Sequence, residues 1–170
     1  IADDIDEATK AELQQVLARA LGGDPAARDD LADRMAGPLK FGTAGLRGPV
    51  RAGPNGMNRA VVVRTTAGVA SWLQANGHGG GLVVVGRDAR RGSEAFAADA
   101  AGVLAAAGFD VRLLSRPLPT PVLAFAVRHL GAVAGIQITA SHNPAPDNGY
   151  KLYDASGVYF NDPATTEIEA

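Results

Sequence analysis

Cysteine is absent from this chain of 170 residues. Its absence excludes disulfide bonds, thiolate metal sites and thiol catalysis, and it fits a cytoplasmic protein, which is the location we expect. No apolar run is long enough to span a membrane, and the start at residues 1–6 is acidic where a signal peptide would be basic. The net charge of −2 creates no basic field, so we expect neither nucleic acid nor a membrane as a partner.

Three common site motifs are also missing from the sequence. There is no G-x-S-x-G, which argues against an esterase even though residues 78–81 (HGGG) resemble an oxyanion loop. The same glycines are not a dinucleotide-binding fingerprint, because they precede an apolar segment and Leu82 stands where the third glycine is required. No G-x-x-x-x-G-K-[ST] occurs, so the phosphate-binding loop of the P-loop NTPases is absent too.

The hydrophobic fraction, 46%, is that of a folded protein, and the length suits one domain with an appended arm. An amphipathic stretch over residues 6–21 predicts a helix that ends at Gly22-Gly23, and residues 29–36 suggest another helical turn. We therefore expect residues 1–38 to form an N-terminal helical arm and residues 39–170 to form the domain proper. The start without Met and the end without a helix stop signal lead us to expect a fragment of a longer protein.

Apolar β-branched runs alternate with helical patterns from Phe41 onward. The pattern predicts buried strands at residues 81–85, 109–114 and 132–139, and helices at residues 58–76, 93–107 and 120–130. The short connections predict an α/β layered domain, with a mostly parallel but mixed sheet between helices and right-handed crossovers. Residues 150–153 and 157–160 predict an antiparallel pair of short strands at one edge.

The most informative polar loop follows the last of the three buried strands. Residues 139–144 read TASHNP and residues 148–151 read NGYK, so a serine hydroxyl, an imidazole and an amine occur together. In open α/β sheets, sites gather in the loops beyond the carboxyl ends of strands. A serine that only satisfies a turn is the common alternative for Ser141. Its neighbour His142, and Lys151 ten residues later, favour covalent chemistry instead.

Lys151 is one of three lysines, against thirteen arginines. A lysine amine can be tuned by burial and by neighbouring cations, whereas arginine stays charged, so a proton-transfer role at Lys151 is chemically sensible. The alternatives are an exposed strand lysine for Lys151 and a hydrogen-bonding loop residue for His142. We interpret His78 and His129 as structural.

Two further loops carry arginines. Residues 41–48 (FGTAGLRG) contain three glycines, so backbone amides can converge on an anion that the guanidinium of Arg47 also binds. The alternative for this loop is a hairpin-like start of the domain. Residues 86–93 (GRDARRGS) could bind phosphate at a helix N-terminus. We expect instead that Asp88 and its three arginines form an ion-pair network that braces the loop.

Five motifs in this order resemble those of one family. The hexapeptide at residues 139–144 resembles the phosphoserine signature of the α-D-phosphohexomutase superfamily, the phosphoglucomutase/phosphomannomutase enzymes. The other four are similar to its arginine loop (41–48), its G-x-D-x-R segment (86–90), its P-T-P turn (119–121) and its N-G-[FY]-K motif (148–151). The likeness covers residues 39–160. Ala44 and the long N-terminal arm are most similar to the phosphoglucomutase-2/phosphomannomutase/phosphopentomutase-like branch.

The resemblance implies the first domain, the phosphoserine domain, of a four-domain enzyme. The aspartate-rich metal loop of the second domain and the substrate loops of the third and fourth are not found in this chain, so we expect no turnover by the chain alone. The implied cofactors are Mg²⁺, which would bind the phosphate on Ser141 together with carboxylates of the missing domain, and a sugar bisphosphate activator. The implied partners are a phosphosugar substrate and the remaining domains.

By the same resemblance, Ser141 would carry the phosphoryl group that moves between the 1- and 6-hydroxyls of a hexose phosphate through a bisphosphorylated intermediate. Lys151 would transfer the proton of the reacting hydroxyl, Arg47 would neutralise the phosphoryl group, and His142 would assist by hydrogen bonding. The residues expected to bind substrate or phosphate are Thr43, Arg47, Asn143 and Lys151.

Three alternatives stay open at this point. A non-catalytic sugar-phosphate binding or regulatory module would keep the loop without the chemistry. A phosphopentomutase would differ only in its sugar, because the sugar is selected by domains outside this chain. A hydrolase using Ser141 and His142 is disfavoured, because adjacent side chains in an extended segment point apart and make a poor nucleophile–base pair.

Overall fold

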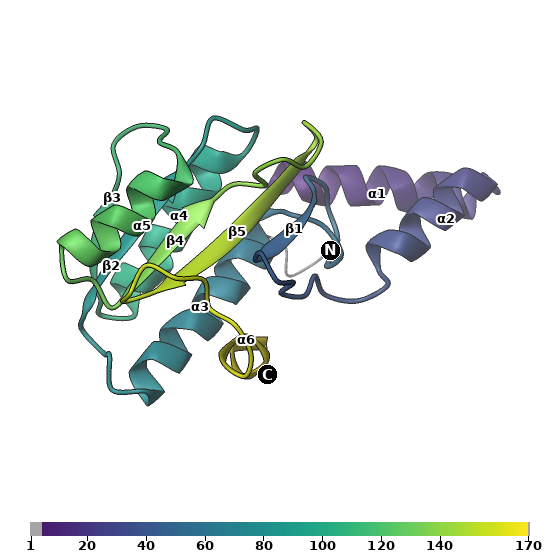
Figure 1. Cartoon of the computed structure of the whole chain (residues 1–170). Coiled ribbons are helices and arrows are strands. Elements are labelled where there is room, and N and C mark those ends of the chain that lie inside the picture. The colour runs from purple at the N-terminus through teal and green to yellow at the C-terminus, as the bar shows by residue number, and fades with distance from the viewer. Residues whose placement is uncertain (1–4, 170) are drawn as a thin grey trace.

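A computed structural model describes residues 5–169, so residues 1–4 of the acidic start, on which the signal-peptide expectation partly rests, lie outside the described part. Figure 1 shows the elements. The helices are α1 (Glu7–Leu21), α2 (Pro25–Arg34), α3 (Arg59–Ala75), α4 (Ser93–Ala106), α5 (Thr120–His129) and α6 (Ala164–Glu169), and the strands are β1 (Leu46–Pro49), β2 (Leu82–Arg87), β3 (Asp110–Leu113), β4 (Ala134–Ile138) and β5 (Asp147–Asp154). Among residues 5–169, no helix combines the length and apolar character that a membrane crossing requires.

The five strands form one mixed sheet in the order β1-β5-β4-β2-β3. β2 pairs in parallel with β3 and β4, whereas β5 runs antiparallel to both β4 and β1. Four strands therefore share one direction and β5 opposes them. Helices α3 and α4 cover one face of the sheet and α5 covers the other (Figure 1). The expected α/β class, with a mixed sheet between helices, is confirmed.

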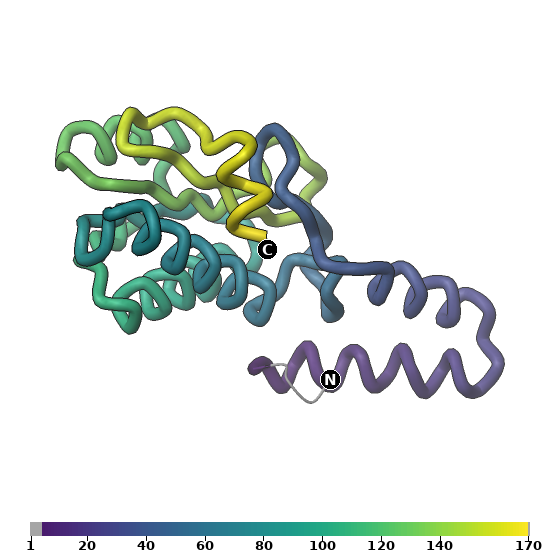
Figure 2. The backbone as a smooth tube through the Cα atoms, turned by 90° about the horizontal axis from the view of Figure 1, so that it is seen from below, coloured from purple at the N-terminus to yellow at the C-terminus, as the bar shows by residue number. Residues whose placement is uncertain are grey.

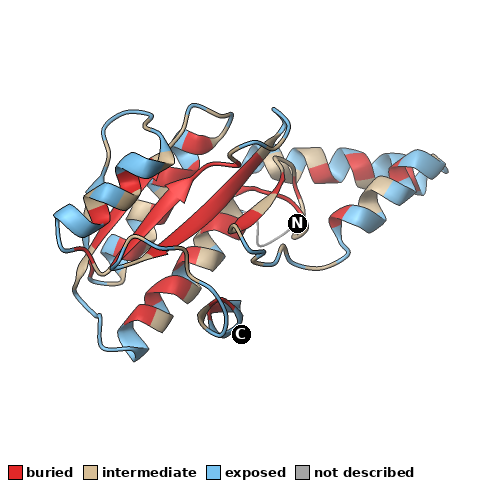
Figure 3. Ribbon diagram, viewed as in Figure 1, coloured by how far each residue is buried: buried red, intermediate tan, exposed pale blue. Residues whose placement is uncertain are grey.

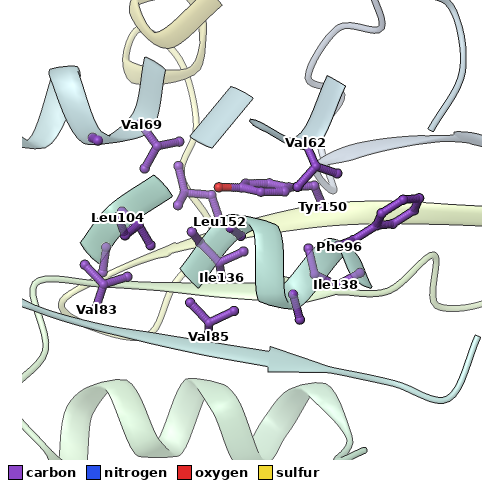
Figure 4. Close-up of a cluster of buried hydrophobic side chains, with 14 of the residues drawn as sticks. Val62, Val69, Val83, Val85, Phe96, Leu104, Ile136, Ile138, Tyr150 and Leu152 are labelled. Carbon is purple, nitrogen blue, oxygen red and sulfur yellow. The ribbon is translucent and has the colours of Figure 1, made fainter. Parts of the chain in front are cut away.

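The core divides between the two faces because successive strand side chains point to opposite sides of a sheet. Val83 and Val85 of β2 face α3 and α4, where the larger cluster includes Phe96, Leu104 and Tyr150 (Figure 4). On the other face, the smaller cluster under α5 contains Val84, Leu123, Val127, Ala132 and Tyr153. Colouring by burial shows the central strands almost wholly buried (Figure 3). Burial on both faces explains their uninterrupted apolar runs.

Two of the strand expectations are wrong in part. The segment at residues 109–114 was expected to be buried, but three of the four residues of β3 are exposed. β3 is the last strand of the sheet beyond β2, so one side has no neighbouring strand. The segment at residues 150–153 belongs to a strand of eight residues, β5, which lies inside the sheet. Residues 157–160 form only a single bridge, Tyr153 with Tyr159, because β1 occupies that side of β5 up to Tyr150.

The N-terminal segment forms two helices that lie side by side and extend away from the sheet (Figure 2). α1 begins after Asp6, whose side chain accepts a hydrogen bond from the amide of Ala8, and it ends at Gly22 as expected. α2 begins earlier than the expected turn at residues 29–36, since Asp24 caps it and Pro25 occupies its first position. The division into an arm at residues 1–38 and a domain at residues 39–170 stays a prediction.

Candidate functional site

Ser141 lies three residues beyond β4 with a backbone φ of 57°. Within residues 5–169 it is the one residue other than glycine with a positive φ, a conformation that L side chains rarely adopt and that often marks functional loops. The amide of Ser141 donates to Thr139 Oγ1 at 3.0 Å, and Thr139 Oγ1 donates to Asp88 Oδ2 at 2.6 Å. A carboxylate after β2 thus fixes the backbone of the serine loop.

Arg90 is the main brace of this loop. Its guanidinium donates hydrogen bonds of 2.8–3.0 Å to four backbone carbonyls, those of Ser141, Asn143, Pro144 and Asp147. A planar guanidinium suits this role because it presents several donors in a fixed fork. The expected ion-pair network of Asp88 with three arginines is wrong: among residues 5–169 only Arg90 pairs with Asp88, at 3.4 Å, and Arg87 pairs with Glu94 instead. The loop is braced by the hydrogen bonds of Arg90 to the carbonyls.

Lys151 lies on β5 directly beside Gln137 of β4, close to where the serine loop begins. Its side chain is almost completely buried, with 3% of the residue exposed. Nζ donates to Ser141 Oγ at 3.4 Å and to the hydroxyl of Tyr159 at 2.9 Å. The expected pairing of the serine hydroxyl with an amine therefore occurs as a direct contact. The alternative of an exposed strand lysine is wrong, because β5 is an inner strand.

Arg47 approaches the same loop from β1, where it pairs with Gly149 of β5. Its guanidinium donates to Asn143 Oδ1 at 3.1 Å and to the carbonyl of Ala44 at 3.4 Å. Its Nε is buried and has no hydrogen-bond partner in the described chain. Buried donors without a partner are rare, so the guanidinium of Arg47 fits an anion-binding role.

The glycine of the arginine loop that packs most tightly is Gly45. Its φ is 92°, and a Cβ atom built there would collide with the carbonyl oxygen of Tyr150. Only glycine allows the loop to lie directly against β5 beside Lys151. This close approach is what brings Arg47 to the serine loop.

The expected site residues divide into two groups. Ser141, Lys151, Arg47 and Asn143 are linked by the contacts above, and Asn143 also donates to Asp147 Oδ2 at 2.9 Å. Thr43 and His142 are exposed and form no side-chain hydrogen bond in residues 5–169. The structure therefore provides no contact that would set them in place, and their roles stay predictions.

The charges around Ser141 are mainly positive, since Lys151, Arg47 and Arg90 all contact its loop. Burial raises the pKa of Tyr153 well above its usual value. Burial, the largest single effect, raises the pKa of Tyr159, but the hydrogen bonds with Lys151 and Tyr153 and the charges of Lys151 and Arg47 together outweigh it, so the pKa of Tyr159 is lowered. A serine that becomes phosphorylated needs such cations, because phosphoserine carries about −1.5 to −2 charges at neutral pH.

No group of three or more His, Asp or Glu side chains that could hold a metal ion occurs among residues 5–169. The carboxylate beside the loop, Asp88, already accepts hydrogen bonds from Thr139, Ser93 and the amide of Arg90. These residues do not fit a complete Mg²⁺ site. A metal ion at Ser141 would need carboxylates from outside the described residues.

Comparison with known proteins agrees with this geometry. Residues 38–170 match the family model described as phosphoglucomutase/phosphomannomutase, alpha/beta/alpha domain I. The chain belongs to this family. The match begins close to the end of the N-terminal helical segment and includes every residue that contacts Ser141.

Similar proteins come from distant organisms. A glucose 1,6-bisphosphate synthase of Mus musculus is 37% identical over 169 residues, which are 94% of this chain and 26% of that protein. A phosphoribomutase of Saccharomyces cerevisiae is 39% identical over 132 residues, 76% of this chain and 21% of the relative. A crystal structure from Thermus thermophilus, of a protein assigned as a phosphomannomutase, superimposes with a TM-score of 0.71 at 42% identity, covering 78% of this chain and 29% of that one. The chain thus spans a fifth to a quarter of the length of its curated relatives.

Two contributors to the site were underestimated from the sequence. Arg90 was assigned to bracing within its own segment, yet it contacts carbonyls more than fifty residues away. Tyr159 belongs to none of the sequence motifs. Its only signal in the sequence is the turn at residues 154–157, which folds the chain back so that Tyr159 lies opposite Tyr153.

Proposed function

We propose that this chain is the phosphoserine domain of a phosphosugar mutase, an isomerase that moves a phosphoryl group within a sugar phosphate. The observation that carries the proposal is the contact between Ser141 Oγ and Lys151 Nζ at 3.4 Å, in a loop whose other cations are Arg47 and Arg90. The family match and the names of the relatives support the same activity.

In the proposed reaction, the phosphoryl group leaves Ser141 Oγ and bonds to the free hydroxyl of a hexose 1-phosphate. Lys151 gives a proton to the departing serine oxygen and regains one from the attacking sugar hydroxyl, and the same transfers run in reverse when Ser141 takes the other phosphoryl group from the bisphosphate. Arg47 neutralises charge on the transferring group. Such transfers depend mainly on positioning and on charge neutralisation, and the fixed loop and its cations provide both.

The remaining parts of the proposal concern the domains and the groups that would bind at Ser141. Residues 1–38 would be an arm, residues 39–170 the first domain, and further domains would supply Mg²⁺ ligands and sugar contacts. Mg²⁺, when bound to the phosphate on Ser141, would neutralise part of its charge. A sugar bisphosphate would act as the activator. Phosphate or substrate would be contacted by His142, Thr43 and Asn143. The chain alone would not catalyse the reaction. The absence of cysteine supports a cytoplasmic location.

Two other functions deserve a direct test. Relatives named phosphoribomutase and phosphopentomutase favour a pentose phosphate as a second candidate substrate. A binding or regulatory module would bind phosphosugars without phosphorylation at Ser141. Intact-mass analysis of the complete enzyme after exposure to glucose 1,6-bisphosphate distinguishes the binding module from a mutase, and the relative rates with hexose and pentose phosphates distinguish the two sugars. We expect one phosphate adduct, located at Ser141.

Substitution of the serine provides the second test. Ser141→Ala in the complete enzyme should remove nearly all mutase activity, because no other group can carry the phosphoryl in its place. The matched control is Ser71→Ala, at an exposed position of α3, which should retain full activity. A Ser141→Ala enzyme that still converts hexose or pentose phosphates would refute the proposal.

A further inference from the structure

Tyr159 reaches the site through a tight turn after β5. The carboxylate of Asp154 accepts hydrogen bonds from the amide of Ser156 at 2.9 Å and from that of Val158 at 3.1 Å, which folds the chain back. Tyr159 then forms an antiparallel bridge with Tyr153, and their ring centroids lie 4.6 Å apart. Lys151 is two residues before Tyr153 and points to the same face of β5. Diagonal neighbours across such a pair are within reach of aromatic and long side chains.

The ammonium of Lys151 has few acceptors. Its nearest is the hydroxyl of Tyr159 at 2.9 Å, while Ser141 Oγ lies at 3.4 Å. Nζ also lies 5.2 Å from the centroid of the Tyr159 ring. No carboxylate forms an ion pair with Lys151 among the residues that the structure describes. Since a buried cation is costly without partners, the hydroxyl of Tyr159 is the main group that stabilises the Lys151 ammonium here.

The two contacts of Lys151 differ in whether they change during the proposed phosphoryl transfer. Ser141 Oγ is the atom at which the proposed reaction makes and breaks a bond, so that contact changes during each cycle. The contact with Tyr159 involves no reacting atom and can persist throughout. A group that transfers protons must stay within reach of the reacting oxygen, and small displacements cost rate.

We propose that Tyr159 is a positioning residue, whose hydroxyl holds the ammonium of Lys151 beside Ser141. The catalytic part of this inference rests on the proposed function, whereas the contact itself does not. The lowered pKa of Tyr159 agrees with it: burial raises this pKa, and the hydrogen bond and charge of Lys151 are among the effects that together outweigh burial. Tyr153, whose ring packs beside that of Tyr159, serves as a matched control, since it forms no hydrogen bond with Lys151 among the described residues.

The first test follows the Lys151 ammonium directly in this chain by ¹⁵N NMR. The chain has three lysines, so the signals can be assigned by substitution. We expect a slowly exchanging Lys151 ammonium signal in the unsubstituted protein and in Tyr153→Phe. In Tyr159→Phe, which keeps the ring and loses the acceptor, its exchange with water should be faster by roughly tenfold or more, in line with one hydrogen bond to a charged group. Exchange in Tyr159→Phe within twofold of the unsubstituted protein overturns the inference.

The second test uses the complete enzyme. Tyr159→Phe should lower kcat by roughly tenfold with KM unchanged, because Tyr159 acts through Lys151 and touches no substrate. Tyr153→Phe should leave both constants unchanged. A fall in kcat matched by a rise in KM, or equal losses in the two variants, would indicate a general structural effect and overturn the inference. The two proposals fail separately: an active Ser141→Ala enzyme refutes the mutase function, whereas unaltered ammonium exchange in Tyr159→Phe refutes the positioning role.

Discussion

Arg90 and Ser141 lie 51 positions apart in the sequence, yet the guanidinium of Arg90 donates a 2.9 Å hydrogen bond to the Ser141 carbonyl. The same group holds the carbonyls of Asn143, Pro144 and Asp147. The loop that carries the serine therefore takes its shape from a side chain that follows a different strand, β2. A loop fixed in this way can present one hydroxyl in one place, which is what a covalent phosphoryl carrier requires.

The first prediction concerns this brace. Arg90→Lys keeps the positive charge but loses the planar set of guanidinium N–H donors, and a single ammonium group cannot reach all four carbonyls. We expect the free energy of unfolding to fall by about 1–3 kcal/mol, the cost of unsatisfied polar groups. Urea denaturation measures it. The matched control is the neighbouring Arg91→Lys, whose exposed guanidinium makes no hydrogen bond in the described chain and whose effect should stay within about 0.5 kcal/mol. Equal effects at the two positions would contradict the role of Arg90.

The second prediction concerns the arginine loop. Gly45→Ala adds a Cβ that collides with the carbonyl oxygen of Tyr150, at a residue whose φ is 92°. Gly77→Ala is the matched control, since Gly77 has a similar φ of 81° but nothing within 4 Å of an added Cβ. We expect the control to lose about 1 kcal/mol from the positive φ alone, and Gly45→Ala to lose roughly 3 kcal/mol or to misplace Arg47. Thermal unfolding of both variants measures the difference, and similar losses would show that the close approach is unimportant.

A third prediction follows from the tyrosine pKa values. Burial raises the pKa values of Tyr150 and Tyr153, whereas the Lys151 hydrogen bond lowers that of Tyr159. As pH rises, Tyr159 should therefore be the first of the three tyrosines to ionise. Lys151→Met removes the cation and leaves the burial, so the pKa of Tyr159 should rise. Absorbance of tyrosinate in alkaline titration measures this. An unchanged first transition in Lys151→Met would show that the two groups are not coupled.

The fourth prediction tests the division between arm and domain. Arg34 joins them, since its guanidinium donates to the Ala52 carbonyl at 3.2 Å and its own carbonyl accepts from the amide of Asn55 at 3.1 Å. A chain lacking residues 1–38 loses both contacts, together with those of Glu12, Asp30 and Asp33 to residues 51–55, but keeps the sheet and the helices that cover it. We expect one cooperative unfolding transition, with a free energy lower by about 1–3 kcal/mol. Urea denaturation measures it, and loss of the cooperative transition would place the boundary elsewhere.

Much of the local structure could be predicted from the sequence. The helices expected at residues 58–76 and 120–130 are α3, which Asn58 caps, and α5, which begins at Thr120, and the buried runs at β2 and β4 form parallel strands. These features depend on neighbouring residues, because caps, helical periods and doubly buried strands are written in short stretches of chain. The candidate site was also anticipated in part, since the order of the motifs indicated Ser141, Lys151, Arg47 and Asn143 together.

Other features depended on contacts between distant segments. That β3 is exposed follows from its place at the end of the sheet, which its own apolar pattern does not encode. The position of β5 inside the sheet follows from the pairing of β1 beside it. Likewise, nothing near Arg90 in the sequence indicates that its partners are the carbonyls of the serine loop.

For this chain, the sequence alone determined which side chains could do chemistry and roughly where each helix and strand begins. The tertiary structure alone decided which of them meet. It placed Lys151 in an inner strand, buried beside Ser141 and Tyr159, and left His142 and Thr43 exposed. The physical reason is that propensities and motifs act over a few residues, whereas burial and hydrogen-bond geometry depend on strand order and on packing across the whole domain.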